Sequence, residues 1–271
     1  MTRAIKPITS LTNERVKAIR ALEMRKERKE TGLFLAEGAS IILTARAAGF
    51  RPETLVYRAG ALETQTQRRL VQTALDDGAE VLEVSGAVLE KLAAKENPQT
   101  MLATFRQRWA LLPEPKTISP KALWLALEDV RDPGNLGTII RTADAVGAAG
   151  IILVGQCTDP YSREAVRATM GSIFNVPLVA VERNTFLTWV PRWLGDRVAT
   201  TLDAREDFRT APYKLPVLLM MGSEGPGLST AMAAIATRRV KIPMAGQLDS
   251  LNLAVATAIL LYQLRGSDLK L

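Results

Sequence analysis

The chain has 271 residues, of which 47% are hydrophobic and 23% charged, and its net charge is +7. This length allows about two domains of ordinary size, and no uncharged apolar run reaches the roughly 18 residues that a membrane span needs. The first residues lack the apolar stretch and cleavage site of a secretory signal. The composition therefore predicts a globular cytoplasmic protein without a membrane segment.

The sequence contains no histidine and a single cysteine, Cys157. One cysteine excludes an intrachain disulfide and a zinc site built from several thiolates. The lack of histidine removes the usual general base, the Ser-His and Cys-His nucleophile pairs and the commonest metal ligand. We therefore expect no metal site, and any enzymatic chemistry must proceed without imidazole.

The positive charge is concentrated near the N-terminus, where the first thirty residues hold nine Lys or Arg against four Glu. Asn13 is predicted to cap a helix over residues 14–29. Two interpretations stay open: a solvated helix with ion pairs along its surface, or an arm that contacts nucleic-acid phosphates. In the second case the candidate RNA-binding residues are Arg25, Lys26, Arg28 and Lys29.

The next part of the chain alternates between short apolar runs and helical patterns. The predicted strands cover residues 34–38, 54–60, 79–85 and 99–108, and the predicted helices cover residues 38–50, 62–78 and 86–96. This pattern predicts a compact α/β domain over residues 1–108. Pro113, Pro115 and Pro120 then indicate an extended linker over residues 109–122.

The second predicted domain covers residues 123–271 and begins with a continuous apolar run that is typical of a strand buried on both faces. Its predicted strands cover residues 122–128, 150–155, 197–203, 216–222 and 240–244, and its predicted helices cover residues 135–148, 162–174, 228–237 and 250–265. Strands that alternate with helices predict an α/β fold with a mostly parallel sheet.

The first candidate functional loop, residues 132–144, lies where a buried strand gives way to a helix. Ligands of parallel α/β sheets bind at the carboxyl ends of strands, so this is a candidate site. Pro133, Gly134 and Asn135 are predicted to form a tight turn, over which Arg141 could reach back. The plain alternative is a well-capped helix that carries a solvated arginine.

The second candidate loop, residues 221–229, contains Gly222, Gly225 and Gly227 directly after a buried strand. Glycines allow backbone amides to approach a ligand closely. The segment has neither the Walker nor the dinucleotide-binding spacing. A nucleotide-cradling loop with Glu224 as acceptor and an ordinary strand-to-helix turn both stay open.

The third candidate segment, residues 242–264, combines a polar cluster with an apolar helix. Asp249, Ser250 and Asn252 lie at the predicted helix N-terminus, where side-chain oxygens cap the helix and free amides can bind a polar ligand. The helix that follows is apolar nearly all round, which indicates burial on several sides. It could be a central core helix or part of a subunit interface.

The three loops, in this order and spacing, resemble the SpoU or TrmH-like family of RNA ribose 2′-O-methyltransferases of the SPOUT class. NLGTIIRTA, GSEGPGLS and IPMAGQLDSLNLAVA resemble its three motifs, and residues 8–38 resemble its N-terminal substrate-binding domain. The resemblance implies a C-terminal α/β trefoil-knot domain with a mostly parallel sheet, an exception to the rule that chains do not thread their own loops. It also implies a smaller N-terminal L30e-like α/β domain.

The resemblance further implies S-adenosyl-L-methionine as the cofactor and a homodimer formed through the C-terminal domain. The cofactor-binding neighbourhoods would be those of Gly222, Ile242, Met244 and Leu251. Many family members have a second serine in the third motif where this chain has Ala254. No cofactor hydrogen bond is expected from that position.

By the same analogy, Arg141 would activate the ribose 2′-hydroxyl. Guanidinium groups stay protonated at neutral pH, so we expect Arg141 to stabilise the forming alkoxide electrostatically. Asn135 would hold Arg141 or the ribose, Glu224 would orient the loop or Arg141, and Ser250 with Asn252 would line the site. A sulfonium methyl group is already electrophilic, so this chemistry needs no metal and no histidine.

These features predict a methyltransferase that modifies a ribose 2′-hydroxyl in structured RNA, and the N-terminal domain favours ribosomal RNA over transfer RNA. One alternative is the same reaction on transfer RNA. Another is a catalytically silent RNA-binding or ribosome-assembly factor on the same scaffold. A nucleotide-binding enzyme of the doubly wound type has less support because the phosphate-binding fingerprints are absent.

Overall fold

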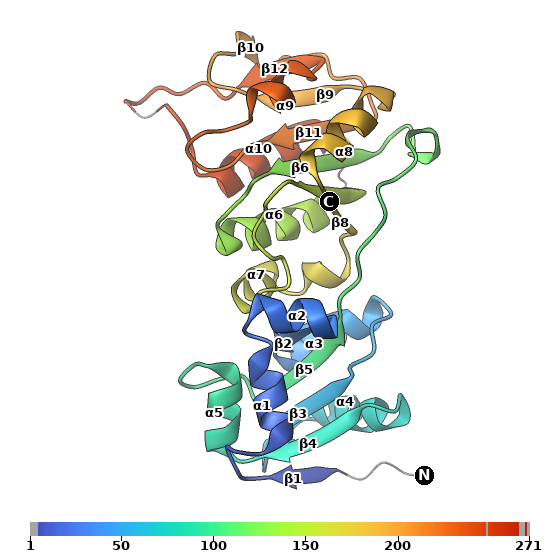
Figure 1. Ribbon diagram of the computed structural model, residues 1–271, viewed down its shortest axis with the longest axis vertical. Helices are drawn as coiled ribbons and strands as arrows, with labels where there is room; N and C mark the ends of the chain where they lie inside the picture. The colour runs from blue at the N-terminus through green and yellow to red at the C-terminus, as the bar shows by residue number, and fades with distance from the viewer. Residues whose placement is uncertain (1–4, 248, 266–268, 270–271) are drawn as a thin grey trace. The chain divides into compact units, whose positions relative to one another are not determined.

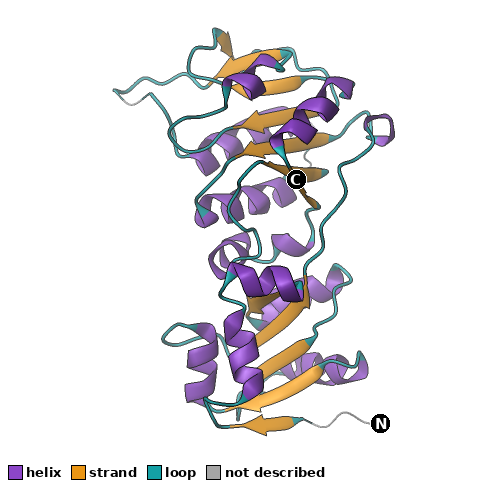
Figure 2. Ribbon diagram, viewed as in Figure 1, coloured by secondary structure: helices purple, strands orange, loops and turns teal. Residues whose placement is uncertain are grey.

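The computed structural model describes residues 5–247, 249–265 and 269, and it contains two compact units (Figure 1, Figure 2). The first unit comprises the described residues up to Gln107 together with Asp159–Asn175. The second comprises Arg108–Thr158 and the described residues from Val176 onward. Residues 159–175 lie within the predicted C-terminal domain of residues 123–271, and in the structure they pack in the first unit.

The first unit is built on a five-stranded sheet in the order β1-β4-β3-β5-β2. Its strands are β1 (Lys6–Ile8), β2 (Leu33–Glu37), β3 (Thr54–Arg58), β4 (Glu80–Val84) and β5 (Met101–Arg106). Its helices are α1 (Glu14–Ala21), α2 (Arg25–Thr31), α3 (Ala39–Ala47), α4 (Gln65–Asp76), α5 (Gly86–Ala93), α7 (Arg163–Thr169) and the 3-10 helix η2 (Ser172–Phe174). Strands β1, β4 and β3 run parallel, and β5 is antiparallel to both of its neighbours.

Aromatic packing explains why residues 159–175 belong to the first unit. The ring of Phe34 lies 4.8 Å from that of Tyr161 and 5.7 Å from that of Phe174, measured between centroids. Phe174 also meets Phe105 edge-on at 5.0 Å. Phe34 and Phe105 are fully buried, and such aromatic pairs stabilise a core beyond their buried area.

The predicted helix over residues 14–29 is wrong in one respect, because α1 and α2 are separate helices. Asn13 does cap α1, with its side chain accepting from Arg15 N at 2.8 Å. The break follows from Arg28, whose side chain is 4% exposed. Its Nη1 donates to the carbonyl oxygens of Leu22 and Glu23 at 2.7 and 2.8 Å, and so satisfies acceptors that the end of α1 leaves open.

The second unit is built on a seven-stranded, all-parallel sheet in the order β10-β12-β9-β11-β6-β7-β8. Its strands are β6 (Leu123–Glu128), β7 (Gly150–Val154), β8 (Leu178–Val181), β9 (Arg197–Thr200), β10 (Glu206–Asp207), β11 (Val217–Met221) and β12 (Arg238–Lys241). Its helices are α6 (Pro133–Ala145), α8 (Arg183–Trp189), α9 (Thr230–Ala234), α10 (Leu253–Arg265) and the 3-10 helices η1 (Pro115–Thr117) and η3 (Val190–Arg192).

Every residue of strand β6, which lies between β11 and β7, is buried, which fits a parallel strand covered on both faces. Trp124 and Ala126 join a core cluster with Phe186 and Trp189 of α8. Helix α10 packs against α6. Because all seven strands point the same way, the loops that follow β6, β7 and β11 all leave the carboxyl ends of the strands. Parallel sheets bind ligands at these ends.

The proline-rich segment before β6 packs on the second unit. Ala110 N donates to Leu178 O at 2.8 Å, and the carbonyl oxygen of Pro113 accepts from Trp189 Nε1 at 2.8 Å. Pro115 is buried. The segment is not extended throughout, in contrast to the linker prediction, because it contains the 3-10 helix η1, and these bonds hold it on the second unit.

Neither a membrane helix nor a metal cluster is found in the part of the chain that the structure describes. None of the helices there combines the length and the apolar character of a transmembrane segment. No group of three or more His, Cys, Asp or Glu side chains among the same residues could hold a metal ion.

Candidate active site

The turn that opens α6 places Asn135 at the centre of the site. Asp132 caps the helix with a side chain that accepts from the Asn135 backbone N–H. The Asn135 side chain bonds in two directions. Its Nδ2 donates to Glu224 Oε1 at 2.8 Å, and its Oδ1 accepts from Asn252 Nδ2 at 2.9 Å. Asn135 therefore connects all three candidate loops.

The glycine loop after β11 folds back tightly on itself. Its residues Ser223 and Gly227 form an isolated bridge, with Gly227 N donating to Ser223 O at 3.1 Å. A Cβ on Gly222 would lie 1.9 Å from the carbonyl carbon of Gly227, so only glycine fits there. Gly225 and Gly227 have φ values of +90° and +70°, which glycine adopts without steric cost.

Glu224 projects from this loop toward the start of α6. In addition to the bond from Asn135, its Oε2 accepts from the backbone N–H of Arg131 at 3.4 Å. Glu224 itself is exposed. One carboxylate thus holds the glycine loop against the turn before α6.

Asn252 serves both as a helix cap and as a link between motifs. Its Oδ1 accepts from Ala254 N at 2.9 Å and from Val255 N at 3.3 Å at the start of α10. Its Nδ2 is the donor to Asn135. A capping residue in which both ends of the amide are engaged has a fixed orientation, so the position of α10 fixes that of Asn252.

The other predicted site residues are exposed or half-buried. Arg141 is exposed on α6, and no hydrogen bond or ion pair within the described residues holds its guanidinium group. Ser250 is exposed, and Leu251 is 37% exposed. Ile242 and Met244 are half-buried in the segment after β12.

The predicted RNA-binding residues on α2 are not alike. Arg25, Lys26 and Lys29 are exposed. Arg28 is not exposed, because its Nη2 pairs with Asp159 Oδ2 at 2.7 Å and its side chain is 4% exposed. The prediction that Arg28 contacts RNA phosphates is thus corrected, because its side chain is buried and paired with Asp159.

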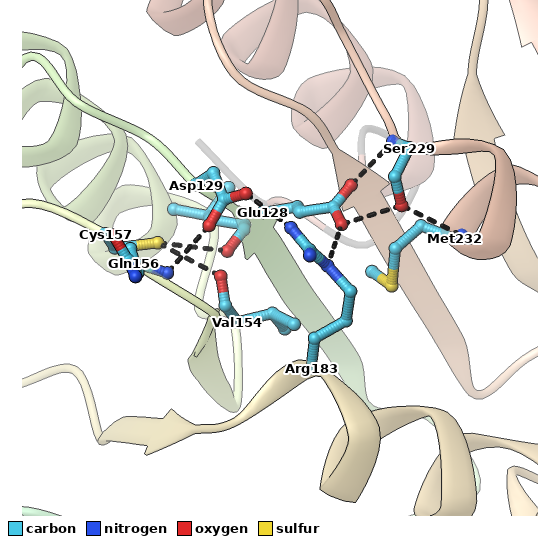
Figure 3. Close-up of polar contacts among 9 residues, drawn as sticks. Glu128, Asp129, Val154, Gln156, Cys157, Arg183, Ser229 and Met232 are labelled. Carbon is cyan, nitrogen blue, oxygen red and sulfur yellow. Dashed lines mark hydrogen bonds and ion pairs between the residues drawn. The ribbon is translucent and has the colours of Figure 1, made fainter.

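An ion-pair network around the buried carboxylate of Glu128 was not predicted from the sequence (Figure 3). Glu128, the last residue of β6, is 2% exposed and accepts from Arg183 Nε at 2.7 Å. The hydrogen bond from Arg183 to Glu128, together with the nearby negative charge, holds the pKa of Arg183 above its usual range. A glutamate at the end of an otherwise apolar strand was the available signal, because a buried carboxylate requires a partner.

Comparison with known protein families gives two matches along the chain. Residues 122–262 match the SpoU rRNA Methylase family. Residues 13–103 match the MRM3-like substrate binding domain. The first match includes the first two candidate loops and the third candidate segment up to residue 262, and the second match lies within the first unit.

Relatives that match along nearly the whole chain are found among curated methyltransferases. The 23S rRNA (guanosine(2553)-2′-O)-methyltransferase RlmP of Bacillus subtilis is 31% identical, with 97% of this chain and 100% of RlmP covered. An uncharacterized tRNA/rRNA methyltransferase of Synechocystis is 35% identical over 98% of this chain and 95% of its own length.

Solved structures agree with these sequence relatives. The crystal structure of an AdoMet-bound rRNA methyltransferase from Sinorhizobium meliloti is 44% identical, with a TM-score of 0.87 and 98% of this chain and 99% of that chain covered. The SpoU methyltransferase AviRb of Streptomyces viridochromogenes, in complex with AdoMet, is 31% identical, with a TM-score of 0.84, and covers 94% of this chain and 98% of its own. Asn135, Glu224 and Asn252 all lie within the matched region, and this chain belongs to the SpoU rRNA methylase family.

Proposed function

We propose that Asn135, Glu224 and Asn252, together with Arg141, form the site at which this protein methylates a ribose 2′-hydroxyl in ribosomal RNA. The protein is an S-adenosylmethionine-dependent RNA 2′-O-methyltransferase of the SpoU family. The observation that carries the residue assignment is the hydrogen-bond chain from Glu224 through Asn135 to Asn252, because it brings three segments distant in sequence into one place.

The loops around Gly222 fit a cofactor that is held by backbone groups. A Cβ on Gly222 would collide with the backbone of Gly227, so the loop brings its main chain close to the end of β11. Ile242, Met244 and Leu251 offer partly exposed apolar surface from the third motif. S-adenosylmethionine, when bound, supplies an electrophilic sulfonium methyl group. The residues named here would bind and orient it.

In the proposed mechanism, Arg141 stabilises negative charge on the 2′-oxygen as its proton is lost. A charged guanidinium aimed at a developing alkoxide lowers the barrier without acting as a base. Asn135 would orient the ribose or Arg141, and Glu224 would keep Asn135 in place. Ser250 and Asn252 would line the ribose side of the site, so that the hydroxyl is held in line with the methyl group.

For the RNA substrate, the exposed cations on α2 are the proposed contact surface. Arg25, Lys26 and Lys29 project from a seven-residue helix in the unit that matches a substrate-binding domain. Cationic side chains of this kind bind phosphates without reading sequence. Ribosomal RNA is favoured over transfer RNA because RlmP, a relative along the full length, acts on 23S rRNA.

A homodimer through the C-terminal domain is also part of this proposal. Val255 and Tyr262 of α10 are 49% and 50% exposed, and half-buried Ile259 lies between them. Their spacing of four and three residues puts them in one stripe of the helix, away from the buried face that packs on α6. Such a stripe suits a second copy of the chain. We propose a cytoplasmic location, where ribosomal RNA is modified.

Transfer of a labelled methyl group tests the function directly. Purified protein is incubated with labelled S-adenosylmethionine and total RNA, and the product is digested to locate the mark. We expect Arg141→Ala to lose about 100- to 1,000-fold in kcat and to keep the cofactor affinity of the wild type. Equal incorporation by both proteins would remove Arg141 from the mechanism. No cofactor binding by the wild type would favour the catalytically silent RNA-binding factor instead.

A further inference from the structure

One arginine outside the three motif loops holds two neighbouring carboxylates at the end of β6 (Figure 3). Arg183, the first residue of α8, donates from Nε to Glu128 Oε1 at 2.7 Å, and its Nη2 donates to Asp129 Oδ2. The Glu128 side chain is 2% exposed. A carboxylate this deeply buried needs a cation beside it, since an unpaired buried charge is strongly unfavourable.

Glu128 connects Arg183 to the glycine loop by hydrogen bonds. Its Oε2 accepts from the backbone N–H of Ser229 at 2.7 Å, and its Oε1 accepts from the Ser229 hydroxyl at 2.8 Å. The loop that begins at Gly222 ends at Ser229. The hydroxyl oxygen of Ser229 also accepts from Met232 N and thereby caps α9. Glu128 therefore holds the far end of the loop, while Glu224 holds its middle against Asn135.

Asp129 begins the connection from β6 to α6, so its pair with Arg183 restrains that connection as well. Its backbone has a φ of +52°, a left-handed conformation that residues with side chains rarely adopt. Its Oδ1 accepts from Gln156 N at 2.7 Å. Gly155 leaves room for this carboxylate, because a Cβ there would lie 2.5 Å from Asp129 Oδ1. Three residues further on, Asp132 begins the turn that presents Asn135.

We infer that Arg183 is a positioning residue for cofactor binding. By pairing with both Glu128 and Asp129, it keeps the end of the glycine loop and the turn before α6 in their relative places. It acts through these carboxylates, and it belongs to none of the three motifs. The inference rests on the proposed function, which assigns the loop from Gly222 to Ser229 to S-adenosylmethionine.

The test compares two substitutions that differ in what they can bridge. Arg183→Gln removes the positive charge, whereas Arg183→Lys retains it and can still pair with Glu128. We expect Arg183→Gln to weaken S-adenosylmethionine binding by about tenfold or more, as befits the removal of a charged hydrogen bond. Arg183→Lys keeps the charge but loses the fork that reaches both carboxylates, so it should bind S-adenosylmethionine more tightly than Arg183→Gln and less tightly than the wild type. At saturating cofactor, kcat of both variants should change less than their cofactor affinity does, because Arg183 contacts none of the proposed reacting groups.

Arg238 provides a matched control in the same unit. It also pairs with two carboxylates, at 2.5 Å from Glu206 and 3.5 Å from Asp196. It is the first residue of β12. It therefore lies at the amino end of this strand, whereas the motif loops follow the carboxyl ends of the strands. Arg238→Gln should lower the melting temperature and leave cofactor affinity unchanged.

Calorimetric titration with S-adenosylmethionine and steady-state kinetics distinguish the outcomes. Weaker binding in Arg183→Gln, partial recovery in Arg183→Lys and normal binding in Arg238→Gln together support the inference. Equal weakening in Arg183→Gln and Arg238→Gln overturns it, because the effect is then one of general stability. Wild-type affinity in Arg183→Gln also overturns it. A wild type that binds no S-adenosylmethionine would instead refute the proposed function.

Discussion

Asn252 donates its side-chain amide to the Oδ1 of Asn135 at 2.9 Å, although 117 residues separate them in the sequence. The same side chain caps α10 through its own Oδ1. The bond thus ties the last described helix of the second unit to the turn that opens α6. The Nδ2 of Asn252 makes the bond to Asn135, whereas its Oδ1 caps α10. A substitution can therefore remove the bond and keep the cap.

The first prediction uses that separation. Asn252→Asp keeps an oxygen that can cap α10, but it places a second oxygen against Asn135 Oδ1. We expect its melting temperature to stay near that of the wild type and its kcat to fall at least about tenfold. Asn252→Ala should lose both properties, with about 1 kcal/mol of stability lost through the cap. Thermal unfolding and methyl-transfer assays check this, and full activity of Asn252→Asp would contradict it.

The second prediction concerns the close backbone approach at Gly222. Gly222→Ala would place a Cβ 1.9 Å from Gly227 C and 2.1 Å from Leu228 N, so the glycine loop must move. We expect S-adenosylmethionine affinity to fall by about 100-fold or more, since even a small misplacement is costly in a preorganised site. Gly86→Ala is the control, because nothing lies within 4 Å of a Cβ there. Retained binding by Gly222→Ala would show that the loop does not hold the cofactor.

The third prediction separates RNA binding from folding on α2. Charge reversal of the exposed residues Arg25, Lys26 and Lys29 to Glu should weaken RNA binding and flatten its dependence on salt. The logarithmic slope should fall by about 0.7 to 0.9 for each phosphate that the variant no longer neutralises. Filter binding over a range of salt concentrations measures this slope. An unchanged slope would place the RNA-binding surface elsewhere.

Arg28→Gln is the contrasting variant. It breaks a buried pair, in which the side chains of Arg28 and Asp159 are 4% and 13% exposed. We expect a decrease of about 3 to 5 kcal/mol in the free energy of unfolding.

The fourth prediction follows from the buried thiol of Cys157. Burial raises the pKa of this thiol from 9.0 to about 11. Between these values the unfolded chain loses the thiol proton while the folded chain keeps it, so stability falls as pH rises. The stabilisation is fully present below pH 9 and amounts to about 2 to 3 kcal/mol.

Cys157→Ser serves as the comparison, because serine can still donate to Leu127 O, as the thiol does at 3.3 Å, and does not titrate. Urea unfolding at about pH 8 and about pH 10.5 should show a steeper alkaline loss of stability in the wild type than in Cys157→Ser, given that a raised thiol pKa makes stability depend on pH. Parallel losses in the two proteins would contradict the assignment.

Local patterns were sufficient for most of the second unit. Continuous apolar runs predicted β6, β7 and β11, since strands buried on both faces are apolar throughout. The resemblance to SpoU motifs selected Asn135, Glu224 and Asn252, and the structure joins them by hydrogen bonds. The assignment of roles to Arg141 and Ser250 stays a prediction.

What the sequence did not reveal depends on interactions between distant residues. The break between α1 and α2 follows from Arg28, whose guanidinium donates to the carbonyl oxygens of Leu22 and Glu23. The helix propensities of the residues do not predict these hydrogen bonds. Strand β1 has three residues including Pro7, too few for an alternating pattern, and it exists because it pairs with β4. The pairing of Arg183 with Glu128 spans 55 residues.

The grouping of Asp159–Asn175 with the N-terminal residues affects how the protein can be divided. A fragment that ends at Gln107 would lack Tyr161 and Phe174, which pack on Phe34 and Phe105, and would expose aromatic surface to water. The two folded parts are therefore interleaved along the polypeptide. A chimaera that joins the N-terminal part to another methylase must therefore find these aromatic contacts in a segment inside the recipient's own methylase domain, because residues 159–175 lie within the family match over residues 122–262.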